Sequence, residues 1–226
     1  METLTFSDNL KRLDMRIHSL ELRGPVILVF DFDELVVLVH LTKLITRRVS
    51  KPVDETVLNN YGHCSFEGIR YLNHLLEGIR YTDYERIRDA LAAQTPWRRG
   101  FKPLPQMLMK KYSIVFLSSG MKDIAHAKLK EINFPEQNII GDEFEVYEGR
   151  IRGSQLVVSD ELKGRVIQKL RQSAKVIAIG HSEGDRCMLQ NATVSIGFNA
   201  APGLARYNVR TVQKLRQIIE TESKPQ

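Results

Sequence analysis

The feature that most constrains the fold is an apolar run with acidic residues set inside it. Residues 26–39 read VILVFDFDELVVLV, with Asp31, Asp33 and Glu34 near the middle. The part up to residue 31 is a continuous Val/Ile/Leu/Phe run, which is typical of a central parallel strand covered on both faces. An unpaired buried carboxylate is costly, so these acids must reach water, a cation or a substrate at the strand end.

Strand and helix patterns alternate along the second half of the chain. This alternation predicts an α/β fold with a Rossmann-like parallel sheet and helices on both faces. The segment EFEVYEGRIRGSQLVV (143–158) predicts a β-hairpin that turns at Glu148-Gly149, and a disordered tail is expected at 221–226. Strands are expected at 112–117, 138–140, 175–180 and 193–197, and helices at 121–132, 161–171 and 185–190.

The first half of the chain is predicted to be helical apart from the strand at 26–31. A first helix is expected with Ser7 as its N-cap and Gly24-Pro25 ending it. No strand pattern occurs from 36 to 111. Helical periodicity is found at 38–49, 53–60, 65–77 and 82–94. We therefore predict a helical insertion at 35–101 and a sheet-containing core made of 1–34 and 102–226.

The charge and cysteine content indicate which classes of ligand and which cellular location to expect. The net charge of +6 and pI of about 9.3 favour anionic partners. The basic residues form scattered pairs without interleaved aromatics, which argues against nucleic acid and leaves small phosphorylated molecules. The two cysteines form no disulfide framework or C-x-x-C motif, and no secretion signal is visible, so a cytoplasmic location is expected. The acids in the apolar run exclude a membrane helix of about 20 residues.

The first candidate site is Asp31-Phe32-Asp33. Side chains alternate along extended chain, so the two aspartates would point to one side with Cα atoms about 6–7 Å apart. One could attack a substrate while the other moves protons. The alternative is that both carboxylates only emerge into solvent at the strand end.

Two further strand ends carry groups suited to phosphate. Ser118, Ser119 and Gly120 stand between a strand and a helix, where hydroxyls and backbone N–H groups bind phosphate oxygens, although a serine there can be a simple cap. Lys163 stands in the first turn of a helix that Asp160 is expected to cap. A cation there opposes the helix dipole and would be explained by a nearby anion.

The fourth strand end carries IGHSEGD (179–185). Its acidic residues, Glu183 and Asp185, could join Asp31 around a hard cation such as Mg²⁺, which prefers oxygen ligands. The alternative for Asp185 is a cap for the following helix.

In this order, DFD, SSG, Lys163 and GHSEGD resemble the haloacid dehalogenase superfamily, in its phosphoserine phosphatase-like branch. The segment SIGFNAAP (195–202) and the helical insertion, which would be the cap domain of that branch, add to the resemblance. It implies that Asp31 is a nucleophile that forms an aspartyl-phosphate and that Asp33 is the general acid and base. Ser118 would hold a phosphate oxygen, and Lys163 would steady the charge. Mg²⁺ would lie between Asp31, the backbone carbonyl of Asp33 and an acid of the fourth motif.

The chain departs from this family pattern near the metal. His181 stands where the family has a metal-binding aspartate, and imidazole suits Mn²⁺, Co²⁺ or Zn²⁺ better than Mg²⁺. We hypothesise that Asp185, helped by Glu183, serves as the metal ligand instead. Leu35 replaces the usual Thr or Val, and Glu34 adds a negative charge beside a site meant for phosphate.

The insertion also departs from the pattern. His40 falls where phosphoserine phosphatases have a substrate-binding Glu, and Asn73 falls near their carboxylate-binding Arg. We therefore expect these two positions to select the substrate, and phosphoserine itself to be a poor one.

The sequence supports two functions. The first is a phosphatase that hydrolyses a small phosphorylated metabolite through an Asp31 phosphoenzyme. The second is a degenerate family member that binds a phosphorylated ligand or a protein partner with little or no turnover, as His181, Glu34 and Leu35 suggest. A homodimer is left open.

Overall fold

A seven-stranded sheet forms the centre of the computed structural model, which describes residues 4–49 and 53–224. The strand order is β4-β3-β2-β1-β5-β6-β7; all neighbours are parallel except the edge strand β4, which runs antiparallel to β3. The predicted α/β class is confirmed. The strands are β1 (Val26–Phe30), β2 (Ser113–Met121), β3 (Ile139–Tyr147), β4 (Arg150–Leu156), β5 (Lys175–Gly180), β6 (Val194–Phe198) and β7 (Tyr207–Val209).

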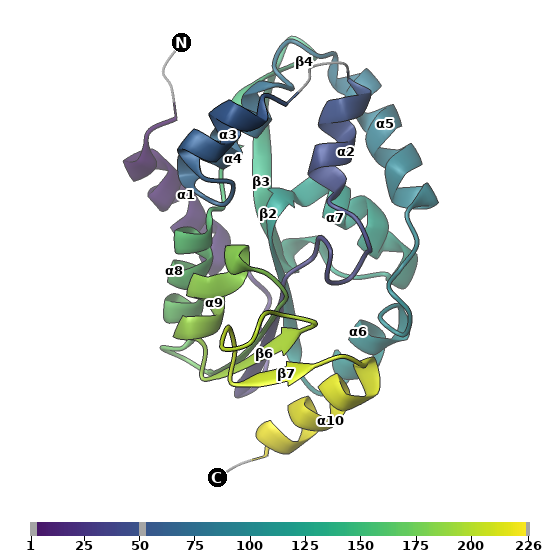
Figure 1. Cartoon of the computed structure of the whole chain (residues 1–226), viewed down its shortest axis with the longest axis vertical. Coiled ribbons are helices and arrows are strands. Elements are labelled where there is room, and N and C mark those ends of the chain that lie inside the picture. The colour runs from purple at the N-terminus through teal and green to yellow at the C-terminus, as the bar shows by residue number, and fades with distance from the viewer. Residues whose placement is uncertain (1–3, 50–52, 225–226) are drawn as a thin grey trace.

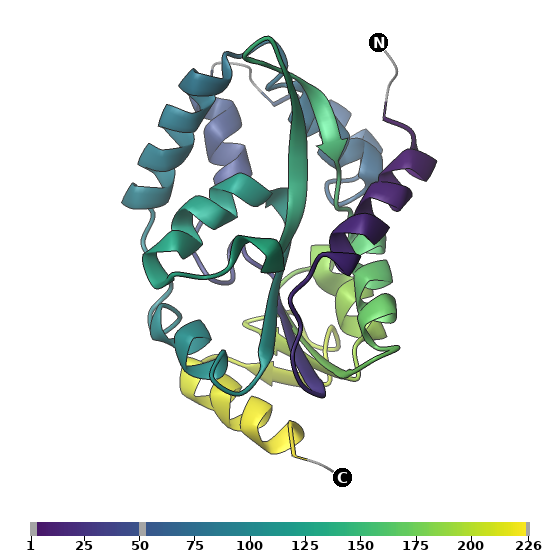
Figure 2. The same ribbon diagram turned by 180° about the vertical axis from the view of Figure 1, so that it is seen from behind.

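Helices cover both faces of the sheet, as Figures 1 and 2 show. Alternate residues of β1 enter two hydrophobic cores: Ile27 and Val29 face one, and Leu28 and Phe30 the other. This burial on both faces explains the unbroken apolar run. The first core is covered by α1 (Phe6–His18), α8 (Asp160–Leu170) and α9 (Arg186–Asn191), and the second by α6 (Pro103–Leu108), α7 (Lys122–Leu129) and α10 (Val212–Glu222).

The insertion is helical, as its periodicity predicts. We call the four helices α2–α5 the cap; at the top of Figure 1, α3 and α4 lie on one side of the β3–β4 hairpin and α2 and α5 on the other. The domain boundaries at 34 and 102 remain predictions. The cap helices are α2 (Leu41–Arg48), α3 (Glu55–Tyr61), α4 (Phe66–His74) and α5 (Tyr81–Gln94), and short 3₁₀ turns occur at Lys130–Ile132, Glu136–Asn138 and Glu183–Asp185.

Two predicted helix caps are wrong. Thr5, not Ser7, caps α1, because its extended backbone lets Oγ1 accept the Asp8 N–H at 3.1 Å. Helix α8 begins at Asp160 with Ser159 as its N-cap. The Asp160 carboxylate instead accepts the backbone N–H of Cys187 at 2.8 Å, which ties α8 to α9.

The predicted β-hairpin is confirmed, but the predicted disorder of residues 221 and 222 is wrong. Glu148 and Gly149 both have positive φ, 48° and 71°, as a two-residue type I′ turn requires. The segment predicted as a separate strand at 138–140 is continuous with the hairpin in β3. Residues 221 and 222, expected to be disordered, complete α10, whose Leu215 and Ile219 are fully buried. Within the described residues, no helix is long and apolar enough to cross a membrane.

A buried polar contact ties the cap to the core. Asn73 of α4 donates from Nδ2 to Asp142 Oδ2 of β3 at 3.0 Å, and Asp142 Oδ1 accepts the Val158 N–H at 2.7 Å. Both side chains are buried. Burial raises the pKa of Asp142 well above its usual value, and the Asn73 and Val158 hydrogen bonds oppose that shift without cancelling it.

We predict that Asp142→Asn stabilises the protein at alkaline pH. The folded state holds the proton of Asp142 more tightly than the unfolded state, so the wild type loses stability as the pH rises above about 4. The variant has no such loss, and its amide keeps the bond to Asn73 if the Asn73 amide flips. Chemical unfolding at pH 5 and pH 8 should show a gain over wild type that is larger at pH 8 by about 1 kcal/mol or more. An equal gain at both pH values would contradict the assignment.

Candidate active site

The candidate active site lies where β1, β2 and β5 end. Asp31 follows β1 directly, and its backbone N–H donates to Ile179 O of β5 at 2.9 Å, which extends the ladder by one residue. Parallel strands deliver their carboxyl ends to one edge of the sheet, where ligands bind in such folds. The sequence prediction that the four motifs meet at one edge is therefore reproduced in this structure.

Lys163 of α8 bridges two carboxylates at this edge. Its Nζ lies 2.8 Å from Asp31 Oδ1 and 2.8 Å from Asp185 Oδ1. All three side chains are almost fully buried, with exposed fractions of 1–5%. Burial alone would lower the pKa of Lys163, but the charges of Asp185 and Asp31 raise it above its usual value. The anionic partner expected for this lysine is thus present.

His181 approaches the other oxygens of the same two carboxylates. Its Nδ1 lies 3.1 Å from Asp31 Oδ2 and 3.3 Å from Asp185 Oδ2. It is aligned with neither oxygen closely enough for a single well-directed hydrogen bond, so the contact is mainly electrostatic. Burial would lower the pKa of His181, but contacts with Asp185 and Asp31 outweigh burial and raise it to about 10.

The loop that carries Asp185 is built to present this carboxylate. Asp185 Oδ2 accepts the backbone N–H groups of His181 at 2.8 Å and Ser182 at 3.2 Å. Burial would raise the pKa of Asp185, but Lys163 and His181 hold it well below its usual value. A Cβ at Gly180 would lie 2.7–2.9 Å from the Asp185 side chain, so this position requires glycine. The alternative expectation, that Asp185 only caps a helix, leaves its contact with Lys163 unexplained.

Asp33 lies in a different environment from Asp31. Its Oδ1 accepts the Leu41 N–H at 3.3 Å, and His40 Nδ1 lies 3.5 Å from its Oδ2. His40 is the N-cap of α2, so the first cap helix begins directly over Asp33. Burial raises the pKa of Asp33 to about 6; His40 opposes the shift and Asp31 adds to it.

Ser118, Ser119 and Gly120, expected between a strand and a helix, lie in the last part of β2 itself, and their phosphate-binding role stays a prediction. Ser118 Oγ accepts the Gly120 N–H at 2.9 Å, and the buried hydroxyl of Ser119 has no hydrogen-bond partner. A Cβ at Gly120 would lie 2.7 Å from both Asp33 Oδ2 and Thr42 Oγ1, so glycine permits the cap to close here. The free hydroxyl of Ser119 and the close approach at Gly120 fit a phosphate-binding role.

Two departures from the family pattern have structural explanations. Leu35 is fully buried in the core that α6, α7 and α10 cover. Glu34 adopts a left-handed backbone (φ 55°), and its Oε2 lies 3.7 Å from His181 Nε2. Arg98, from the segment that follows the cap, donates to the backbone carbonyls of both residues and thereby holds this turn.

Not every predicted site residue joins the cluster. Glu183 is exposed and pairs with Arg186 at the surface. Asn73 has its amide group engaged by Asp142. Of the described residues, Asp31, His181 and Asp185 form a group whose ligand atoms all lie within 4.8 Å of one another, near enough to hold a metal ion.

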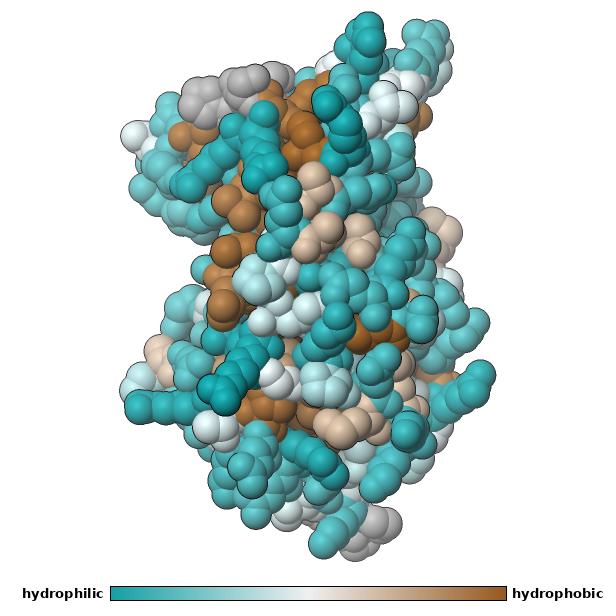
Figure 3. Space-filling view, turned by 90° about the vertical axis from the view of Figure 1, so that its right-hand side faces the viewer, coloured by the Kyte–Doolittle hydropathy of each residue, from teal (hydrophilic) through white to brown (hydrophobic). Residues whose placement is uncertain are grey.

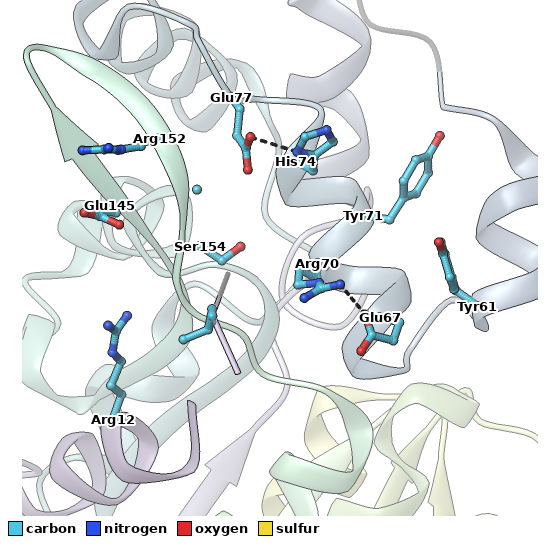
Figure 4. A pocket seen from close by; sticks show the side chains of 12 residues that line it. Arg12, Tyr61, Glu67, Arg70, Tyr71, His74, Glu77, Glu145, Arg152 and Ser154 are labelled. Atoms are coloured by element: carbon cyan, nitrogen blue, oxygen red, sulfur yellow. Dashed lines mark ion pairs between the residues drawn. The ribbon is translucent and has the colours of Figure 1, made fainter. Parts of the chain in front are cut away.

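A separate groove lies away from this cluster. A groove of about 670 Å³ separates α4 from β4 and α1, with Arg70 and His74 on one wall and Arg12 and Arg152 on the other (Figure 4). It contains none of the residues around Asp31, and Asp31 itself is only 3% exposed. Sequence patterns gave no signal for this groove. Figure 3 shows a waist between the upper and lower parts of the molecule, at the left edge of that view.

Comparisons with known proteins identify the fold. No family model matches the chain, and no curated protein matches it by sequence. A substrate-bound phosphoserine phosphatase structure superposes with a TM-score of 0.68 at 18% identity, covering 89% of this chain and 99% of that one. A probable phosphoserine phosphatase from Vibrio cholerae gives 0.66 at 17% identity, covering 97% and 74%. The chain has the haloacid dehalogenase fold of the phosphoserine phosphatase type. A phosphoserine phosphatase from T. onnurineus also matches, with a TM-score of 0.67 at 16% identity, covering 87% of this chain and 94% of that one.

We predict that Gly120→Ala loosens the cap of this haloacid dehalogenase fold. The added methyl would overlap Asp33 and Thr42, and overpacking of this kind costs about 1–3 kcal/mol. Amide hydrogen exchange should increase over α2 (41–48) while α10 is unchanged. Adding Thr42→Ala should restore part of the protection. Unchanged exchange in α2 would contradict the close packing described here.

Proposed function

We propose that this protein is a phosphatase that hydrolyses a small phosphorylated metabolite through an aspartyl-phosphate on Asp31. The main observation in support is that two neighbouring aspartates have different electrostatic surroundings. Asp31 contacts the cationic Lys163 and His181, whereas burial raises the pKa of Asp33 to about 6. A nucleophile must be ionised and an acid must be protonated, and pairs of groups with separated environments serve these two roles.

In the first step, a carboxylate oxygen of Asp31 attacks phosphorus and the ester P–O bond breaks. Asp33 transfers its proton to the leaving oxygen, so a neutral alcohol departs. Ser118, Ser119 and the backbone N–H groups at the start of α7 would hold the phosphoryl oxygens. Lys163 remains on Asp31 and offsets the negative charge that gathers there.

In the second step, the ionised Asp33 takes a proton from water, and the resulting hydroxide attacks phosphorus. The bond between phosphorus and the Asp31 oxygen breaks, inorganic phosphate leaves, and both aspartates return to their starting states. Because Asp31 and Lys163 are nearly inaccessible, substrate entry requires α2 to move away from Asp33.

Magnesium, the ion that the resemblance implies, fits these residues poorly. Mg²⁺ requires oxygen ligands in near-ideal octahedral geometry, whereas this group offers an imidazole nitrogen. Both oxygens of Asp31 and of Asp185 already lie within 3.3 Å of nitrogen atoms of Lys163 and His181. No step above therefore passes through Mg²⁺. Mn²⁺, Co²⁺ and Zn²⁺ accept a nitrogen ligand more readily, but they would meet the same carboxylate oxygens already contacted by Lys163 and His181.

The substrate is proposed to be a phosphate ester other than phosphoserine. The family's substrate-binding Glu and Arg correspond to His40, which caps α2, and Asn73, which binds Asp142. Neither supplies the carboxylate and guanidinium that an amino acid would need.

The competing proposal is a binding protein with little turnover. Four acidic side chains surround the phosphate position (Asp31, Asp33, Glu34 and Asp185), and they favour this alternative because they would repel a dianionic substrate.

We predict that Asp31→Asn abolishes hydrolysis of p-nitrophenyl phosphate. The amide is not a nucleophile, so the rate should fall at least about 100-fold. Glu183→Gln is the matched control, because it removes a charge from the same edge of the sheet but only at an exposed surface pair. Activity equal in wild type and Asp31→Asn, or absent from the wild type with every metal tested, would favour the binding protein.

The acid role of Asp33 predicts a pH dependence for substrates with poor leaving groups. With the pKa of Asp33 raised to about 6, the protonated acid is depleted above that pH. The kcat/KM for an alkyl phosphate, corrected for the substrate's own ionisation, should fall about tenfold per pH unit above pH 6 to 7. The same profile with Asp33→Asn, or a flat profile in the wild type, would rule out this role.

A further inference from the structure

The imidazole of His181 lies in the middle of an anionic cluster. Its Nδ1 faces Asp31 Oδ2 at 3.1 Å and Asp185 Oδ2 at 3.3 Å, and its Nε2 faces Glu34 Oε2 at 3.7 Å. The ring is about four-fifths buried, since its side chain is 19% exposed. Three carboxylates from two segments of the chain thus converge on one ring.

Lys163 takes the remaining oxygens of two of these carboxylates. It contacts Asp31 Oδ1 and Asp185 Oδ1, so each carboxylate lies between one lysine and one histidine. A divalent ion between Asp31 and Asp185 would have to displace the imidazole, because Nδ1 stands within 3.3 Å of the oxygen that each would offer. The backbone N–H groups of His181 and Ser182 further engage that oxygen of Asp185.

Glu34 makes sense only together with His181. Alone, it would add negative charge beside the phosphate position, which opposes the binding of an anion. Its left-handed backbone, held by Arg98 on the Glu34 carbonyl, turns the side chain toward His181. The two unusual residues therefore form a pair in which one supplies a cation and the other its counter-ion.

We propose that the side chain of His181 replaces the metal ion in this site, with Glu34 as its counter-ion, so that the protein needs no divalent metal. The inference deepens the proposed phosphatase function, on which its role in catalysis rests. The His181 ring and Lys163 together contact all four carboxylate oxygens of Asp31 and Asp185 before substrate binds.

The deciding experiment measures metal binding rather than activity. Metal-depleted wild type is titrated by calorimetry with Mg²⁺, Mn²⁺, Co²⁺ and Zn²⁺ at pH 7.5. We expect no saturable one-to-one binding of any of them that is lost in Asp185→Asn. In His181→Asp, which restores an oxygen donor, Mg²⁺ should bind at least tenfold more tightly than in wild type. Glu183→Gln, which changes the charge as Asp185→Asn does but at an exposed position, should behave as wild type.

Two results would overturn the proposal. One is saturable binding of a divalent ion by the wild type that Asp185→Asn abolishes, because His181 would then be a ligand and not a substitute. The other is a folded His181→Asp that binds no Mg²⁺, since the histidine would then not be what keeps the ion out. The wild-type titration decides the question even if His181→Asp does not fold. Because no substrate is used, failure of the phosphatase function would leave these results unchanged.

Discussion

The buried contact of Lys163 with Asp31 and Asp185 is the interaction on which the rest of the site depends. It joins α8 to the end of β1 and to the loop after β5, which are the elements that bring three of the four motifs together. A buried charge without its partner costs about 3–5 kcal/mol, so none of the three residues can be lost without penalty. This cluster therefore holds α8 against the ends of β1 and β5 and contributes two carboxylates and one ammonium group to the site.

One short segment gives two aspartates different surroundings because the chain bends between them. Asp31 continues the ladder beside β5 and faces Lys163, while Asp33 lies beyond the buried ring of Phe32 and faces the start of α2. The left-handed turn at Glu34 sends the chain away from the sheet and into the cap. Two identical side chains thus have different neighbours. Asp31 contacts Lys163 and His181, and Asp33 contacts the buried first turn of α2.

The sequence predicted the sheet and the position of the site because both rest on local patterns. Apolar runs identify strands buried on both faces, and parallel strands place Asp31, Ser118 and His181 at one edge. The contact of Asn73 with Asp142 spans 69 positions, and no local pattern reports it. Helix α10 is not among the sequence predictions, although its Leu215 and Ile219 are core residues. The contact between Glu34 and His181 could not be predicted either, since in the sequence each residue is a separate departure from the family pattern.

The cap also determines how far the Asp33 carboxyl is shielded from water. The pKa of this carboxyl is raised chiefly by burial, and that burial depends on α2, whose first residue donates a backbone N–H to Asp33. In the proposed reaction, α2 would move away to admit a substrate, and water reaching Asp33 would favour its ionised form. Closure of α2 would then restore the affinity of this carboxyl for a proton when the leaving group needs one. Asp31 is placed differently, because its partners, Lys163 and His181, both belong to the core. The division between cap and core thus separates the proposed nucleophile, which core residues hold, from the proposed acid, whose burial depends on the cap.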